Sequence, residues 1–229
     1  MDQSSLHQSR VIPQVYRELG RSGEGALRVR KYYALRDRIG DIDTPPAQRV
    51  RRLKEYHRPE LYREIFDDDS RAIALYLQKE AEALTPPAGL AQALDYLRSK
   101  GIGLAVVSEA LSPETVESIT RFLAVHHLEV YFEEVITPAG AHNRAGAVDR
   151  SFAGLTKKDG RIYDRLVEVL ARRDIKPNDS VIVGDDPQTD IVPAKARDMH
   201  TIQYTGVIDR GPSDADFIIR SWEDIRAIL

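Results

Sequence analysis

The sequence predicts an α/β protein, in which a helical unit is followed by a parallel sheet with helices on both faces. Between residues 9 and 83, apolar residues recur at helical spacing, and no run is typical of a buried strand. After residue 85, short β-branched apolar runs alternate with amphipathic helices, which is typical of a parallel sheet covered on both faces. We therefore expect an α-helical domain over residues 1–84 and an α/β domain over residues 85–229.

The composition excludes several classes of function. The chain has 229 residues, of which 42% are hydrophobic, enough for one good core or a core domain with a smaller companion. Its formal net charge of -3 gives no electrostatic basis for binding nucleic acid or an anionic membrane surface. Without cysteine it has no disulfide framework and no thiol nucleophile. With no apolar run long enough to span a bilayer, we expect a soluble, cytoplasmic protein without nucleic-acid or membrane partners.

The first domain is expected to consist of helices separated by glycine and proline. The helical patterns cover residues 10–19, 25–39, 47–57 and 58–84. They are punctuated by Gly20, Gly23, Gly25, Pro45, Pro46 and Pro59. The acidic stretch FDDDS, residues 66–70, is expected to precede or cap the helix from Arg71, because the spacing of a calcium loop is absent.

Helices and strands alternate along the second domain. Ser112, Pro113 and Glu114 open one helix, because serine is a favourable cap and proline is tolerated at the first helical position. Further helices are expected over residues 90–101, 158–174 and 189–199. Strands are expected over residues 102–108, 130–138, 179–186 and 200–206, and residues 215–229 supply a short strand and a closing helix.

Polar side chains follow three of the expected strands. Ser108, Thr137 and Asp185 each end a strand, and Asp190 and Lys157 lie close by in the sequence. In open parallel sheets, ligands bind beyond the carboxyl ends of the strands, so we expect these groups to face one crevice. Carboxylates suit Mg²⁺, and an ammonium and a hydroxyl suit phosphoryl oxygens. The pattern therefore predicts a site for a phosphorylated ligand.

Each of these residues also has a purely structural interpretation. Ser108 is compatible with ordinary strand-to-helix punctuation, Lys157 with a solvated surface lysine, and Asp190 with the positive end of a helix. The adjacent carboxylates Asp185 and Asp186 are harder to explain in this way. Carboxylates at a buried strand end repel each other unless a cation or hydrogen-bond donors offset their charge.

Three segments resemble motifs of the haloacid dehalogenase superfamily, which consists mainly of phosphatases and phosphomutases. LAVVSEA, residues 104–110, resembles the second motif, which implies that Ser108 binds the phosphoryl group. KKDGRIY, residues 157–163, resembles the third motif, which implies that Lys157 neutralises the nucleophile and the phosphoryl oxygens. VGDDPQTDI, residues 183–191, resembles the fourth motif, GDxxxxD, which implies that Asp185 is a Mg²⁺ ligand and Asp190 a second partner, directly or through water.

The resemblance covers residues 85–229 closely and residues 9–83 only in kind. It implies a Rossmann-like, three-layer parallel sheet with an α-helical cap over residues 1–84. It also implies Mg²⁺-dependent hydrolysis of a small phosphorylated metabolite through an aspartyl-phosphate. The implied partners are such a substrate or phosphate itself.

The family's nucleophile motif, DxDx[TV] after the first strand, has no match in the expected position. The nearest string, GDIDTPP, places Asp41 and Asp43 after a segment that is no buried strand, and we assign both to a cap loop. The first residues, MDQSSLHQSRVIPQVYREL, resemble the segment that follows this motif in family members. We therefore expect weak or absent phosphatase activity, and weak Mg²⁺ binding, from the chain as given.

In the family's strand order, the missing strand lies between the strands that end at Ser108 and Gly184. Three arrangements are open: an upstream segment supplies the strand, the two flanking strands pair directly, or a strand from a partner fills the slot. The last two make the chain a non-catalytic binding or scaffold protein that still holds an anion at Ser108 and Lys157.

The segment between Thr137 and Lys157 is about ten residues longer than the family leads us to expect, and loops of this length are often functional. One interpretation is a substrate loop with contacts from residues 142–144, His-Asn-Arg; the other is a surface excursion through which two copies form a homodimer. The extra length also leaves Lys158 as an alternative to Lys157. Glu109 adds a negative charge beside the expected phosphoryl site.

Overall fold

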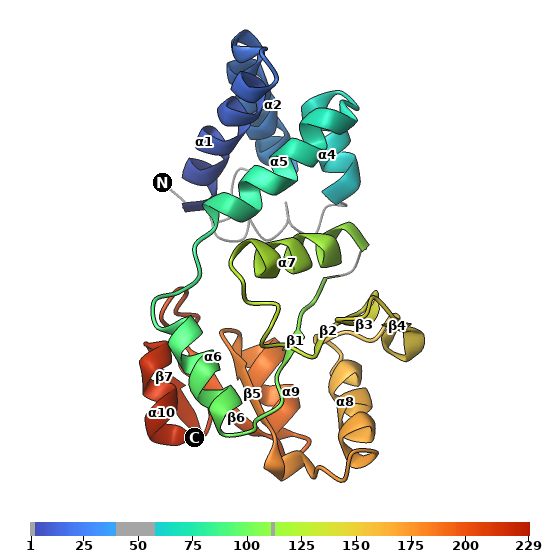
Figure 1. The fold of residues 1–229 in the computed structure, drawn as a ribbon, viewed down its shortest axis with the longest axis vertical. Coiled ribbons are helices and arrows are strands. Elements are labelled where there is room, and N and C mark those ends of the chain that lie inside the picture. The colour runs from blue at the N-terminus through green and yellow to red at the C-terminus, as the bar shows by residue number, and fades with distance from the viewer. Residues whose placement is uncertain (1–2, 40–57, 111–112) are drawn as a thin grey trace. The chain divides into compact units, whose positions relative to one another are not determined.

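The computed structural model describes residues 3–39, 58–110 and 113–229 and divides into two compact units (Figure 1). The helical unit runs to Thr85 and includes Glu117–Val125, and the α/β unit comprises Pro86–Val116 and His126–Leu229. The expected helix over residues 47–57 lies outside the described residues, as do Asp41 and Asp43, which are expected in a cap loop.

The helical unit is built around a core of aromatic and branched side chains. Its helices are α1 (Gln3–Glu18), α2 (Ser22–Ile39), α4 (Arg58–Phe66) and α5 (Ser70–Ala83), and α7 (Pro113–Val125) contributes its residues from Glu117. Tyr16, Phe66 and Tyr76 are buried together, with Tyr16 stacked on Phe66 at 6.3 Å between ring centroids. Asp69 caps α5 by accepting a hydrogen bond from the Ala72 amide at 3.0 Å, which confirms the interpretation of the FDDDS stretch.

The strands of the α/β unit form two sheets. The first has the order β1-β2-β3-β4, with β1 (Ala105–Val107), β2 (Glu134–Thr137), β3 (Gly140–Asn143) and β4 (Val148–Asp149). The second has the order β5-β6-β7, with β5 (Val181–Gly184), β6 (His200–Tyr204) and β7 (Phe217–Ile219). β1 and β2 pair in parallel, as do β5, β6 and β7. The expected strands are confirmed, but β3 and β4 add an antiparallel hairpin that the sequence did not predict.

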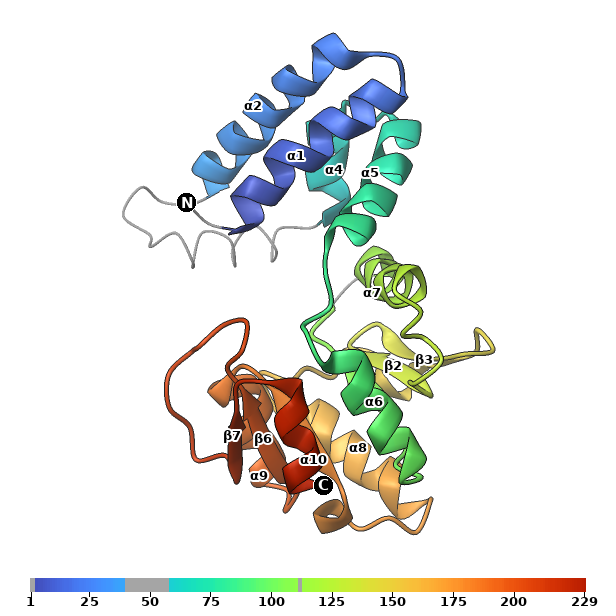
Figure 2. The ribbon, with the colours of Figure 1, turned by 60° about the vertical axis from the view of Figure 1, so that its left-hand side comes forward.

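Helices lie on both sides of the strands (Figure 2), and their apolar residues belong to two layers. One layer contains residues of α6 (Leu90–Ser99) and α10 (Ile225–Ile228), and the other contains residues of α8 (Arg161–Ala171) and α9 (Val192–Lys195). Short turns of helix occupy Arg150–Phe152, Pro177–Asp179, Pro187–Ile191 and Trp222–Asp224. None of the helices in the described ranges is long and apolar enough to cross a membrane.

The break between the two sheets lies inside this layered structure. Val107 of β1 and Ile182 of β5 pack in one apolar layer, while Val181 and Val183 pack in the other, so both faces of β5 are covered. Yet β1 and β5 are each terminal in their sheet and are not paired with each other in the described part of the chain. All four residues of β5 are only half-buried. The structure therefore does not have the direct pairing of β1 with β5 that was one of the three arrangements considered for the missing strand.

Candidate functional site

The end of β5 leads into a tight acidic turn. A side chain at Gly184 would collide with Asp190, so glycine is needed for Asp190 to fold back over the strand end. Asp186 caps the turn by accepting hydrogen bonds from the amides of Gln188 and Thr189, at 2.9 and 3.2 Å. Its own amide donates to Asp190 Oδ2 at 3.1 Å. Asp190 is only 4% exposed, so its charge requires partners.

Lys157 supplies the main partner of Asp190. Its Nζ atom lies 2.6 Å from Asp190 Oδ1, and the two side chains are 15% and 5% exposed. The backbone amide of Lys157 donates to Glu109 Oε2 at 2.7 Å. Glu109 follows Ser108 at the end of β1, and the Ser108 amide is anchored to the carbonyl of Ile136 at 2.9 Å. The contacts from Glu109 through Lys157 to Asp190 therefore join the ends of β1 and β5 across the break.

Tyr163 holds helix α8 against the acidic turn. The side chain is completely buried, and its hydroxyl donates to the carbonyl of Thr189 at 2.9 Å. Burial raises the pKa of Tyr163, and the nearby carboxylates of Asp190 and Glu109 raise it further. The phenol therefore stays neutral over the physiological pH range, where it is a donor that fixes the turn.

Arg210 is a member of the site that sequence reasoning missed. It lies in the connection between β6 and β7, and its Nε atom is 2.6 Å from Asp185 Oδ2. Its Nη1 atom lies 3.8 Å from Asp186 Oδ2. The hydrogen bond to Asp185 is the main reason that the pKa of Arg210 is raised. The only signal in the sequence is a basic residue within a turn-forming DRGP stretch, which does not indicate a partner.

Thr137, the other polar residue predicted at a strand end, has a local role. It is fully buried, and its Oγ1 donates to the carbonyl of Gly140 at 3.1 Å and accepts from the amide of Ala139 at 3.1 Å. These bonds shape the turn from β2 into β3, where Gly140 has a φ of 129°. Thr137 therefore stabilises the hairpin and has no measured bond to the acidic turn.

His142, Asn143 and Arg144, the possible substrate contacts of the long segment, lie in or beside the same hairpin. His142 is paired in register with Val135 and Val148. Asn143 accepts a hydrogen bond from the Ala147 amide at 3.0 Å, closing the turn between β3 and β4. The guanidinium of Arg144 donates to two backbone carbonyls of residues 130 and 132, both at 2.6 Å. These contacts are structural, and the segment extends the sheet at the β2 side.

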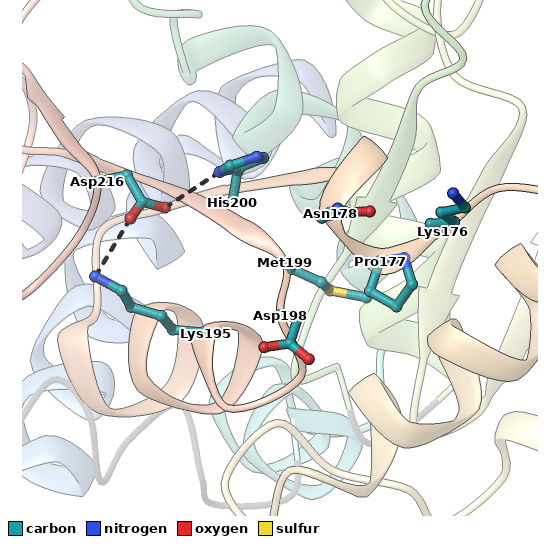
Figure 3. A pocket seen from close by; sticks show the side chains of 8 residues that line it. All are labelled: Lys176, Pro177, Asn178, Lys195, Asp198, Met199, His200 and Asp216. Atoms are coloured by element: carbon teal, nitrogen blue, oxygen red, sulfur yellow. Dashed lines mark ion pairs between the residues drawn. The ribbon is translucent and has the colours of Figure 1, made fainter.

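A pocket of about 710 Å³ lies elsewhere on the α/β unit (Figure 3). It is lined by Lys176, Pro177, Asn178, Lys195, Asp198, Met199, His200 and Asp216. Asp216 lies between Lys195 at 3.3 Å and His200 at 3.7 Å. Because His200 begins β6, the pocket is at the amino ends of the strands, opposite the polar residues at their carboxyl ends.

Comparison with known proteins identifies the family. The family model of haloacid dehalogenase-like hydrolases matches residues 6–197. The chain belongs to this family. The comparison with curated proteins gives no match.

Solved structures of this hydrolase family share the fold. A HAD phosphatase from Thermococcus onnurineus has a TM-score of 0.60 and 23% identity, covering 98% of this chain and 88% of that one. The putative HAD-hydrolase YfnB from Bacillus subtilis, in a structure bound to magnesium, has a TM-score of 0.58 and 12% identity, covering 99% and 92%. A 2-haloacid dehalogenase from Pseudomonas syringae has a TM-score of 0.57 and 17% identity, covering 98% and 90%. The predicted Rossmann-type α/β fold is confirmed.

The strand-end residues of this haloacid dehalogenase-like hydrolase do not fit the Mg²⁺ site that its family implies. Both carboxylate oxygens of Asp190 are engaged, one by Lys157 and one by the Asp186 amide. Asp185 is engaged through one oxygen, Oδ2, by Arg210. Within the described ranges, no group of three or more metal-binding side chains is arranged to hold an ion. Ammonium and guanidinium groups thus occupy positions where a divalent cation requires free carboxylate oxygens.

Proposed function

We propose that this haloacid dehalogenase-like hydrolase holds the phosphate of a small phosphorylated metabolite at the ends of β1 and β5. In this proposal the Ser108 hydroxyl and the Lys157 ammonium bind the phosphoryl oxygens. The observation that carries it is the chain of contacts from Glu109 through Lys157 to Asp190, which brings the second, third and fourth motif segments to one place. We also propose that the helical unit corresponds to the α-helical cap domain of this family.

The ancestral chemistry of such a site is phosphatase chemistry through an aspartyl-phosphate, and we infer that the chain as given performs it weakly or not at all. That chemistry needs a carboxylate nucleophile aimed at phosphorus. Asp185 forms an ion pair with a guanidinium, and Asp190 forms one with a buried ammonium. A carboxylate in such an ion pair is a poor nucleophile. We also infer that Mg²⁺ binds weakly while these ion pairs persist.

The test is an assay of the purified full-length chain on p-nitrophenyl phosphate with Mg²⁺. We expect turnover at the background rate, unchanged in Asp185→Asn. Robust turnover that Asp185→Asn abolishes would contradict the inference of a missing nucleophile.

Phosphate binding is measured separately, by isothermal titration with inorganic phosphate. We expect binding to weaken at least about tenfold in Ser108→Ala and in Lys157→Met, because each loses a donor to the anion. Lys158→Met is the matched control, since Lys158 is exposed and next in the chain. An equal loss of phosphate affinity in Lys157→Met and Lys158→Met would show that Lys157 does not bind the phosphate.

A second function is favoured by the edges of β1 and β5 that have no strand partner in the described residues. In this alternative the protein is a non-catalytic binding or scaffold protein, and a strand from a partner completes the sheet by pairing with both edges. A second copy of the chain is one such partner, which would make the assembly a homodimer. Nucleic acid and membrane are not among the expected partners. A chain that stays monomeric and binds phosphate with no partner present favours the first proposal over this one.

A further inference from the structure

We propose that Arg210 is a built-in counter-ion at the end of β5, which competes with divalent cations for Asp185 and keeps the affinity of this site for metal low. The inference rests on the proposed function only in taking the end of β5 as the ligand site. It differs from the family expectation, in which Asp185 is a free metal ligand.

The charges around the turn are incompletely balanced. We define the acidic cluster as the carboxylates of Asp185, Asp186, Asp190 and Glu109. Among the described residues, the two cations that contact it are Lys157 and Arg210, so four negative charges meet two positive ones. Lys157 forms an ion pair with Asp190, and Arg210 is the cation that pairs with Asp185. A divalent cation bound to Asp185 would lie within a few ångströms of the guanidinium, and the two would repel each other.

The residues that follow Arg210 are held in place by hydrogen bonds to one buried side chain. Gln203 of β6 is fully buried, and its Nε2 donates to the carbonyl of Gly211 at 2.8 Å. The hydroxyl of Ser213 donates to Gln203 Oε1 at 2.7 Å. The connection between β6 and β7, a wide loop in Figure 2, is therefore tied to the sheet on the C-terminal side of Arg210. A buried amide left without partners is costly, so these bonds keep the loop in place.

Stability alone does not account for this ion pair. The side chains of Arg210 and Asp185 are each 39% exposed, and ion pairs with this exposure contribute little to folding free energy. The larger effect of Arg210 is on the electrostatic potential at Asp185, which decides whether a second cation can bind there. Removing the guanidinium raises the excess of negative charge in the cluster from two to three.

The test is a calorimetric titration of the full-length chain with Mg²⁺ alone, with no phosphate ester present. We expect Arg210→Met to bind Mg²⁺ at least about tenfold more tightly than the unchanged chain, because a unit charge at this range is removed. Arg210→Lys, which keeps the charge, should stay within about threefold. Arg220→Met is the control, because Arg220 is an exposed arginine of the same unit.

Two further variants make the result decisive. Adding Asp185→Asn to Arg210→Met should cancel the gain, because the ligand is then neutral. Ser213→Ala, which loosens the loop while Arg210 keeps its charge, should give a smaller gain. The proposal is overturned if Arg210→Met gains no affinity, if Arg220→Met gains as much, or if the gain persists in the double variant. None of these outcomes affects the phosphate-ester assay, so failure here is distinguishable from failure of the proposed function.

Discussion

Lys157 and Asp190 form an ion pair with both partners largely buried, at 15% and 5% exposure. Asp190 satisfies its second oxygen with the Asp186 amide, so the carboxylate has a donor on each side. Such a pair adds modest net stability because both ions lose hydration, but the removal of one partner leaves the other charged and buried. The pair therefore fixes the geometry of the turn.

Lys157→Met should lower the free energy of unfolding by about 3 kcal/mol, because it leaves the buried carboxyl group of Asp190 without its cation. Lys158→Met should change it by no more than about 0.5 kcal/mol, since the side chain is exposed. Urea titrations of both variants test this. A double variant with Asp190→Asn should lose less than the sum of the two single changes, because they break the same interaction. Additive losses would show that the two residues are not coupled.

At the same scale, the sequence predicted part of the site. A lysine before the helix that follows one expected strand, and a GDxxxxD pattern after another, were enough to predict that Lys157 and Asp190 lie close together. The ion pair makes Lys157 rather than Lys158 the contacting residue. The sequence did not predict that Asp185 is paired with Arg210, 25 residues away. That contact depends on how the β6–β7 connection folds over the strand ends, and no local pattern encodes it.

At the scale of elements, the junction of α4 and α5 shows how a short acidic run ends one helix and begins another. Asp67 and Asp68 have positive φ angles, 51° and 59°, which no helix continues through. Asp69 then caps α5, and it also pairs with Arg21 at 2.5 Å. The hydrogen bond from the Ala72 amide, and then Arg21, hold the pKa of Asp69 below its ordinary value.

Asp69→Ala should therefore destabilise the helical unit by about 1 kcal/mol at neutral pH, the usual cost of losing a helix cap. Because the folded-state pKa is lowered, the contribution of the Asp69 charge is complete above the unfolded-state value of about 4 and is lost as the pH falls through the folded-state value. Urea titrations followed by circular dichroism at pH 7 and pH 3 measure both effects. The difference in stability between the unchanged chain and Asp69→Asn, which keeps a cap but no charge, should shrink at pH 3. A difference that does not depend on pH would contradict this account.

Most elements were predictable because their signals are local. The apolar periodicity of residues 161–171 and the β-branched run of residues 181–183 identify α8 and β5 without any tertiary information. The hairpin of β3 and β4 was not predicted, because its strands, of 4 and 2 residues, are too short to show an alternating pattern and lie in a polar segment rich in glycine and alanine. Those strands are stabilised by pairing with β2, which a single-sequence pattern does not contain.

At the scale of the whole α/β unit, the two sheets share one apolar layer, which contains Val107, Ile136 and Ile182, but they are not bonded to each other in the described residues. β6 is paired on both sides, and residues 201–203 are completely buried. β5 is paired on one side only and is half-buried although both its faces are covered. We attribute this exposure to the edge of β5 that has no strand partner in the described residues.

This difference predicts the pattern of hydrogen exchange in the dilute chain. The amides of residues 105–107 and 181–184 should exchange on average at least about tenfold faster than those of residues 201–203, because strands with an open edge exchange through smaller openings than central ones. Mass spectrometry of proteolytic fragments, or nuclear magnetic resonance, measures this directly. Equal protection of β5 and β6 in the dilute chain would contradict an open edge. If the protection of β1 and β5 rises with protein concentration while that of β6 stays constant, a second copy of the chain covers both edges. This result would favour the strand-addition alternative over a ligand site that is complete in the monomer.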